Sequence, residues 1–228
     1  GPLAFQGGLA AEKILTLFDR EGKAQGTIGE AAMYSEIRLS RDNRYLAAGI
    51  DAEGGGQSDI WVYDLSRNVG SRLTFDEARD THPGGSPAGE RVAFTANRGG
   101  KSGIFVRSAD GRGDAELLIT VEGQSVVQDW SPDGKYLVFD SGIGKNDVWI
   151  LNLEDGESFA LVSSDFDVGY TRCSPDGNWI GYISNEAGKY ELYLTRFPSG
   201  EGKWQLSKEG ADWLLGWNDA GTELFYLD

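Results

Sequence analysis

The sequence predicts an all-β protein built from repeated four-stranded antiparallel blades, and three observations lead to this prediction. A turn motif recurs five times, an alternating strand follows each turn, and glycine is frequent (33 residues) while helix signals are weak. The anchor residues of the turns are Ser40, Ser86, Ser131, Ser174 and Asn218, so the successive spacings are 46, 45, 43 and 44 residues. Four-stranded propeller blades repeat at roughly 40–45 residues. The predicted fold is therefore a β-propeller with about five blades.

Each repeat has the same order of elements, as the segment WSPDGKYLVFD at 130–140 illustrates. In its turn, Pro presets φ, Asp can accept a hydrogen bond from the backbone ahead of it, and Gly accepts a positive φ. Alternating apolar residues after the turn indicate the second strand. We expect third strands at 59–65, 103–109, 147–153 and 191–197, and short fourth strands at 71–75, 115–119, 159–163 and 203–207.

The two ends of the chain supply incomplete blades. Candidate strands lie at 3–7, 13–19 and 25–29, and the segment 214–227 supplies two more. The window 10–21 also has the spacing of an amphipathic helix, but the repeat register favours strands. Two arrangements of the ring are compatible with these ends: the ends complete a five-bladed ring with one strand to spare, or the natural protein continues past Asp228 into a sixth blade.

The repeats predict a single domain over residues 1–228. The predicted boundaries are a partial blade at 1–38, full blades at 39–84, 85–129, 130–172 and 173–216, and a partial blade at 217–228. If the ring is open, unpaired blade edges allow self-association.

Composition limits the classes of partner. The formal charge is −15, which disfavours binding to nucleic acid or to an anionic membrane and is compatible with a cationic partner. No apolar run is long enough to span a membrane, and residues 1–10 lack the features of an intact signal peptide. The single cysteine, Cys173, allows no internal disulfide.

The turn and third-strand motifs, SPDG and DIWVYDL, resemble the repeats of TolB-like, WD40-like (PD40) β-propellers. The run at 174–227, which begins SPDGNWIGYISNEAGKYELYLTRF and ends ELFYL, is similar to the propeller attached to bacterial eukaryotic-like serine/threonine kinases and to some winged-helix regulators. The segment 15–30 resembles the opening blade of that family. The resemblance implies a recognition role beside a separate catalytic or DNA-binding domain, usually six blades, and a bacterial periplasmic or other extracytoplasmic location.

Catalytic motifs are incomplete. His82 is the only histidine, and although Ser86 is near it in sequence, Ala88 replaces the second glycine of a nucleophile elbow. The segment 100–102 ends like a phosphate-binding loop but lacks the upstream glycine, so a hairpin turn is predicted. The protein is therefore expected not to be an enzyme and to need no cofactor.

Acidic residues raise two further possibilities. One histidine and one cysteine cannot build a zinc site, and the acids at 76–80 and 165–167 do not match calcium-loop spacing, so no metal is predicted. Glu30, Asp129 and Asp140 suggest the paired carboxylates of a glycosidase, but we expect them to be ordinary surface and turn acids. Four tryptophans, at 61, 130, 149 and 217, are expected to pack between blades.

Candidate ligand-binding residues lie on the segments that lead from the fourth strand of one blade into the next blade. These segments meet around one mouth of a propeller channel, and here their polar and aromatic residues differ from blade to blade. They are Glu36, Arg38, His82, Gln128, Asp129, Tyr170, Arg172 and Trp213. Mixed acids, arginines and aromatics suit a protein or peptide ligand. The alternatives are an accessory gating domain of a peptidase, a propeller hydrolase, or a self-associating propeller fragment.

Overall fold

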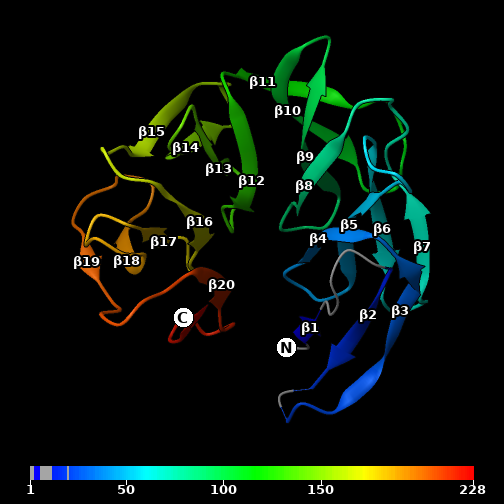
Figure 1. Cartoon of the computed structure of the whole chain (residues 1–228), viewed down its shortest axis with the longest axis horizontal. Coiled ribbons are helices and arrows are strands. Elements are labelled where there is room, and N and C mark those ends of the chain that lie inside the picture. The colour runs from blue at the N-terminus through cyan, green and yellow to red at the C-terminus, as the bar shows by residue number, and fades with distance from the viewer. Residues whose placement is uncertain (1–2, 6–11, 20) are drawn as a thin grey trace. The chain divides into compact units, whose positions relative to one another are not determined.

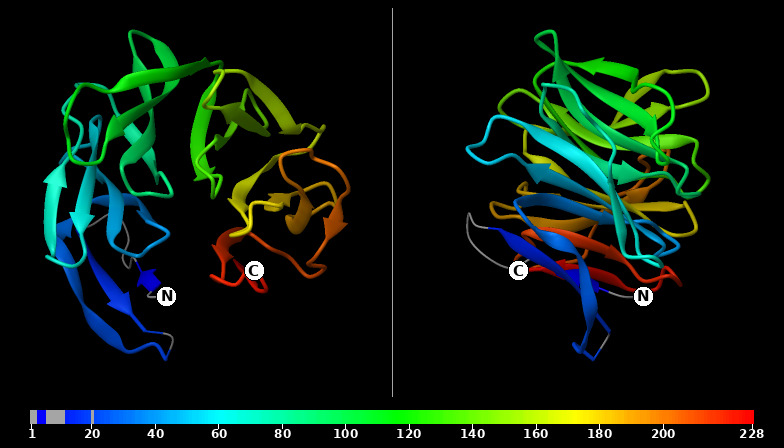
Figure 2. Two further views of the ribbon diagram at one scale, coloured as in Figure 1. Left: turned by 180° about the vertical axis from the view of Figure 1, so that it is seen from behind. Right: turned by 90° about the vertical axis from the view of Figure 1, so that its right-hand side faces the viewer.

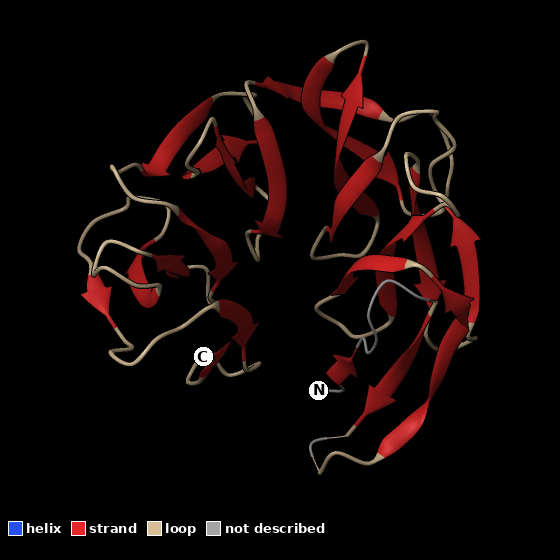
Figure 3. Ribbon diagram, in the orientation of Figure 1, coloured by secondary structure: helices blue, strands red, loops and turns tan. Residues whose placement is uncertain are grey.

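A computed structural model describes residues 3–5, 12–19 and 21–228 of the chain. Within these ranges every regular element is a β-strand and no helix occurs (Figure 3). The strands form six antiparallel sheets: four have four strands, one has three and one has two. The all-β prediction of repeated four-stranded antiparallel blades is confirmed. The chain divides into two compact units, Gly1–Thr120 and Val121–Asp228.

The first unit contains three sheets, and consecutive strands are neighbours in each (Figure 1). The first sheet comprises β1 (Leu3–Phe5), β2 (Lys13–Phe18) and β3 (Ala24–Ala32). The second comprises β4 (Tyr34–Leu39), β5 (Tyr45–Asp51), β6 (Ser58–Asp64) and β7 (Val69–Arg72). The third comprises β8 (Asp80–Gly85), β9 (Arg91–Arg98), β10 (Lys101–Ser108) and β11 (Glu116–Val121).

The strand prediction for the N-terminal window is confirmed for residues 13–18, which pair with β1 on one side and β3 on the other. Residues 6–7 of the first predicted strand, and residues 10, 11 and 20 of the alternative helix, lie outside the described residues. The predicted hairpin at 100–102 is also confirmed. Gly99 and Gly100 both have positive φ (62° and 76°) and join β9 to β10, as a two-residue hairpin turn requires.

The second unit contains two complete sheets and one pair of strands (Figure 2). The first sheet comprises β12 (Gln124–Trp130), β13 (Tyr136–Gly142), β14 (Asp147–Asn152) and β15 (Ser158–Val162). The second comprises β16 (Val168–Cys173), β17 (Trp179–Ser184), β18 (Glu191–Arg196) and β19 (Trp204–Gln205). The pair is β20 (Trp213–Trp217) with β21 (Leu224–Leu227).

The repeat turns have one common geometry, which explains why their sequences are alike. In all five, the amide of the third residue after the anchor donates to the anchor carbonyl, with N···O distances of 2.8–3.0 Å. The Ser131 hydroxyl donates to Asp133 (2.6 Å) and accepts from the amide of Tyr136 (2.9 Å). Asn43 has a positive φ of 56° where the other four turns have glycine, and asparagine tolerates this conformation. The turn at 40–43 therefore keeps its shape without the glycine.

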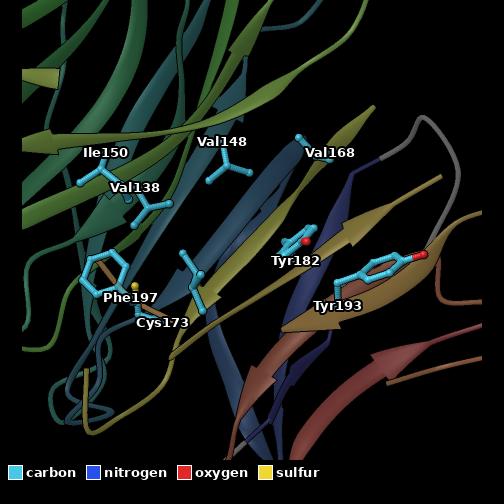
Figure 4. Packing of buried hydrophobic residues seen from close by; sticks show 9 residues of the cluster. Val138, Val148, Ile150, Val168, Cys173, Tyr182, Tyr193 and Phe197 are labelled. Atoms are coloured by element: carbon cyan, nitrogen blue, oxygen red, sulfur yellow. The ribbon is translucent and has the colours of Figure 1, made fainter. Parts of the chain in front are cut away.

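Apolar side chains fill the space between neighbouring sheets within each unit. In the second unit, Val138, Val148 and Ile150 from β13 and β14 pack with residues of β16, β17 and β18 (Figure 4). The rings of Tyr182 and Tyr193 stack with centroids 5.6 Å apart. In the first unit, similar clusters join β1–β3 to β4–β7 and β4–β7 to β8–β11. Burying this apolar surface is the main force that holds consecutive blades together.

Of the tryptophans predicted to pack between blades, Trp61 packs against a cluster that spans two sheets and Trp217 contacts a neighbouring sheet, whereas Trp149 stacks on a residue of its own sheet. Trp130 is 1% exposed, and Trp61 packs against the cluster around Leu46. Trp149 stacks on Phe139 with ring centroids 6.5 Å apart. Trp217 is partly buried, and its indole N–H donates to the carbonyl of Arg172.

Candidate binding site

A β-bulge interrupts the first strand of every complete blade and of the last strand pair. The pairing shifts between Tyr34 and Ile37 in β4, Thr81 and Gly84 in β8, Val127 and Asp129 in β12, Gly169 and Arg172 in β16, and Leu214 and Gly216 in β20. A bulge leaves an extra residue outside the hydrogen-bond ladder and changes the direction of its side chain. Four of the predicted binding residues, Glu36, His82, Gln128 and Tyr170, lie within these bulges.

Two of the bulged residues have an uncommon backbone conformation. His82 and Tyr170 stand four positions before Ser86 and Ser174, and both have a φ of 53°. This left-handed region costs a non-glycine residue about 1 kcal/mol or more. Strained residues of this kind often occur at functional sites, where the surrounding fold holds a side chain in a required direction.

In the first unit, the structure brings Glu36 and His82 together. The His82 Nε2 atom lies 3.3 Å from the Glu36 carboxylate, and its Nδ1 atom lies 3.0 Å from the Thr81 hydroxyl. Burial lowers the pKa of His82, and the charges of Arg38 and Arg79 lower it further against the opposing effect of Glu36. The lowered pKa favours the neutral form of His82. The cavity beside Arg38 has a volume of about 20 Å³, which is room for one water molecule rather than a ligand.

In the second unit, the Arg172 side chain joins its own sheet to two other sheets. Its Nη1 atom donates to the carbonyl and to the Oε1 atom of Gln128 (3.0 and 3.2 Å), and its Nε atom donates to the carbonyl of Leu215 (3.3 Å). Asp129 accepts from the amide of Cys173 at 2.9 Å. Gln128, Asp129 and Arg172 are thus brought together, and their contacts fix the bulged strands β12, β16 and β20 to one another.

Asp140 lies beneath this network. It is 5% exposed, and its Oδ2 atom accepts hydrogen bonds from the side chain of Gln128 and from the amide of Tyr170 (3.2 Å), whereas Oδ1 has no hydrogen-bond partner. Burial raises the pKa of Asp140 to about 8, and its hydrogen bonds and Arg172 only partly oppose this. A Cβ atom at Gly169 would lie 2.8 Å from Oδ2, so the close approach requires glycine there.

The burial of Asp140 corrects one sequence-based expectation. Glu30 is exposed as expected, but Asp140 is not a surface or turn acid. The bulge in β16 brings the Tyr170 amide over Asp140 and supplies a donor that local sequence does not reveal. Asp129 contacts main-chain amides on both oxygens, which is a structural arrangement rather than that of a catalytic acid.

Above Asp140 lies a surface that we call the acidic aromatic patch: Asp167, Tyr170, Tyr190, Asp212 and Trp213. The rings of Tyr170 and Trp213 contact each other with centroids 5.0 Å apart and are 38% and 54% exposed. Tyr190 is 38% exposed and its hydroxyl donates to Asp167 at 3.0 Å. Burial, followed by the negative charges of Asp140, Asp167 and Asp212, raises the pKa of Tyr170. The patch therefore combines exposed aromatic rings with a negative potential.

Sequence reasoning identified Tyr170 and Trp213 but missed their neighbours Asp167, Tyr190 and Asp212 as parts of one surface. These five residues come from the β15–β16 loop, strand β16, the β17–β18 turn, and the first residue of β20 with the residue before it. The repeat register could have aligned these segments, because all of them flank the start of a first or third strand. Contact between the Tyr170 and Trp213 rings depends on how two sheets pack, which the register does not specify.

The motifs considered for catalysis do not assemble among the described residues. Ser86 accepts a hydrogen bond from the amide of Arg91, while His82 contacts Thr81 and Glu36, so no Ser86–His82 pair forms. Within 3–5, 12–19 and 21–228, no group of three or more His, Cys, Asp or Glu side chains is arranged to hold a metal ion. No helix in the described part of the chain is long and apolar enough to cross a membrane.

Comparison with known proteins finds one matching family model and several related proteins. The family model of the TolB β-propeller domain (PD40) matches residues 31–213. The Tol-Pal system protein TolB of Francisella tularensis is 27% identical over 181 residues, which are 78% of this chain and 41% of that protein. A Bacillus subtilis protein named as the uncharacterized peptidase YuxL is 24% identical over 166 residues, which are 56% of this chain and 25% of that protein.

A solved structure supports the fold. The crystal structure of TolB from Acinetobacter baumannii superposes with a TM-score of 0.76 at 20% identity, covering 91% of this chain and 53% of that one. This chain thus spans only about a quarter to two fifths of the length of the curated relatives that it matches.

Proposed function

Because the chain belongs to the TolB β-propeller family, we propose that it is a non-catalytic binding or sensing module that recognises a protein or peptide through the acidic aromatic patch. The observation that supports this most directly is the exposed pair of Tyr170 and Trp213, held in contact on two neighbouring bulged strands. Large aromatic side chains exposed on a rigid scaffold are characteristic of recognition surfaces, since they bury much area with few rotatable bonds.

The remaining predicted residues have supporting roles in this proposal. Gln128, Asp129 and Arg172 hold the bulged strands together beneath the patch, and Asp140 holds the amide of Tyr170. Pre-formed support of this kind reduces the entropy lost when a partner binds. Glu36, Arg38 and His82, which are half-buried, are proposed as a second contact region in the first unit, where the bulges of β4 and β8 carry Glu36 and His82.

The relatives support protein recognition in two ways. The match to a protein of the Tol-Pal system favours a role in recognising another protein, and the match to a peptidase favours the second candidate, an accessory domain that controls access to a separate catalytic domain. Attachment to a kinase or a winged-helix regulator stays a prediction from the sequence resemblance. In each case, the propeller supplies recognition and the chemistry lies elsewhere.

The proposal is tested by selecting binders from a random twelve-residue peptide library displayed on phage. Tyr170→Asn and Trp213→Ser are the test variants, because asparagine tolerates the left-handed φ at position 170 and Trp213 is 54% exposed. Trp204→Ser is the matched control, since Trp204 is 44% exposed on β19 but contacts Trp179 instead of the patch. Thermal melts check that all variants are folded.

We expect selected peptides to bind the natural sequence and the Trp204→Ser variant equally, and to lose about tenfold or more in affinity for both patch variants, which corresponds to about 1.4 kcal/mol or more. Equal binding to the natural sequence and the patch variants would place recognition elsewhere on the chain and contradict the proposal.

A further inference from the structure

The chemistry of the acidic aromatic patch indicates what kind of side chain it accepts. Resting on the function proposed above, we propose that the partner presents a lysine or arginine side chain, which lies against the exposed rings of Tyr170 and Trp213 and is paired with the carboxylate of Asp212.

The rings offer a face to a cation. Tyr170 and Trp213 touch at an interplanar angle of 46°, and both residues remain exposed in part to solvent. A guanidinium or ammonium group over such a face is attracted by the negative charge of the π-system, most strongly over tryptophan. The same chain already uses this contact internally, because the guanidinium of Arg196 lies 3.8 Å from the ring centroid of Trp179.

The charges around the rings are unbalanced. Asp212 is exposed beside Trp213, and its negative charge acts on both Tyr170 and Tyr190. Lys189, which is next to Tyr190 in the sequence, lies 3.4 Å from Glu191, and Lys145 lies 3.7 Å from Asp147, so both lysines have an acidic partner of their own. The whole chain has a formal charge of −15, so a cationic segment is also attracted from a distance.

The buried acid behind Tyr170 can respond to such a cation. The Oδ1 atom of Asp140 is buried without a hydrogen-bond partner, and the other oxygen of this carboxyl holds the amide of Tyr170. Unpaired buried polar atoms are rare and usually have a functional explanation. A cation arriving at Tyr170 favours the ionised form of this acid and so gives the unpaired oxygen an electrostatic role.

The test continues from the selected peptides and uses the whole chain. Each peptide whose binding depends on Trp213 is also made with every Lys and Arg replaced by Gln. Both peptides are titrated by isothermal titration calorimetry into the protein of natural sequence and into its Asp212→Asn and Asp219→Asn variants. Asp219 is the matched control, because it is an exposed aspartate in the turn that joins β20 to β21. The Asp212 amide donates to the carbonyl of Leu227, and this bond does not involve the substituted side chain.

We expect the selected peptides to contain Lys or Arg, and the Gln versions to bind about tenfold more weakly. Asp212→Asn, but not Asp219→Asn, should reduce the affinity for the selected peptides several-fold, and this loss of affinity should become smaller as salt is added. Peptides that depend on Trp213 but bind equally well without Lys or Arg would overturn this inference and leave the proposed function intact. If no selected peptide depends on Trp213, both proposals fail.

Discussion

The buried carboxyl of Asp140 predicts a specific pH dependence of stability. Its pKa is raised from an unfolded value of 3.8 to about 8 in the folded protein. Between these values the folded state holds one proton more than the unfolded state, so the free energy of unfolding falls as the pH rises. The loss begins near pH 4 and is complete near pH 8. Within this window the slope is about 1.4 kcal/mol per pH unit.

The substitution Asp140→Asn isolates this effect. Asparagine has the shape of the protonated acid, and its oxygen can accept the hydrogen bonds from Gln128 and Tyr170, but it does not titrate. All other groups titrate in both proteins and cancel when their stabilities are subtracted. Between pH 5 and pH 7, we expect the natural sequence to lose about 3 kcal/mol relative to Asp140→Asn, from two pH units at the slope of one proton.

The assay is urea unfolding followed by circular dichroism at pH 5, 6 and 7. Asp176→Asn is the control: the Ser174 hydroxyl lowers the pKa of this carboxyl, so it is ionised throughout the range and the difference should not change with pH. If the curves for the natural sequence and Asp140→Asn are parallel from pH 5 to 7, Asp140 is ionised in the folded protein, and the reasoning from its burial is refuted.

Three further substitutions test the scaffold by urea unfolding. Arg98→Met removes the guanidinium that lies 3.2 Å from the fully buried Asp80 carboxylate and should lower the free energy of unfolding by about 3–5 kcal/mol. A decrease below 1 kcal/mol would contradict this, and adding Asp80→Asn should restore part of the lost stability. Ser131→Ala removes the hydroxyl that accepts from Tyr136 and should cost about 1–2 kcal/mol, so an unchanged midpoint would argue against a stabilising turn. Ile180→Ala opens a cavity in the second unit's core and should cost about 2–5 kcal/mol, and a neutral result would mean that the core is not close-packed.

The parts of the fold that could be predicted from the sequence are those that short segments encode by themselves. The turn at Ser131 depends on residues within five positions of the anchor, so its hydrogen bonds follow from local chemistry. Third strands such as Asp147–Asn152 alternate and are flanked by turns, and the structure places them within one or two residues of the prediction. The strand β7 begins at Val69, two residues before the predicted start, because the turn before it ends at Asn68, whose φ is 51°.

The site depends on pairings that no short segment specifies. The bulge that contains Tyr170 exists only because β16 pairs with β17 in a shifted register. The burial of Asp140 depends on that bulge and on Gln128 in a neighbouring strand. Asp212 and Trp213 meet Tyr170 through the packing of two sheets, although they are more than 40 positions away in the sequence. The sequence repeats predict which segments carry candidate binding residues, whereas the pairing of strands and the packing of sheets decide which of those side chains lie together.

The repeated bulges have a consequence for the diversification of this scaffold. A residue in a bulge, such as Glu36, His82 or Tyr170, makes no regular ladder pair, so replacing it alters neither the strand register nor the core between blades. Evolution or a directed library can therefore vary these positions one blade at a time while the turns and cores stay constant. Varying residues 36, 82 and 170, with residues that tolerate a left-handed φ at 82 and 170, should yield a family of stable proteins that share one framework and bind different targets.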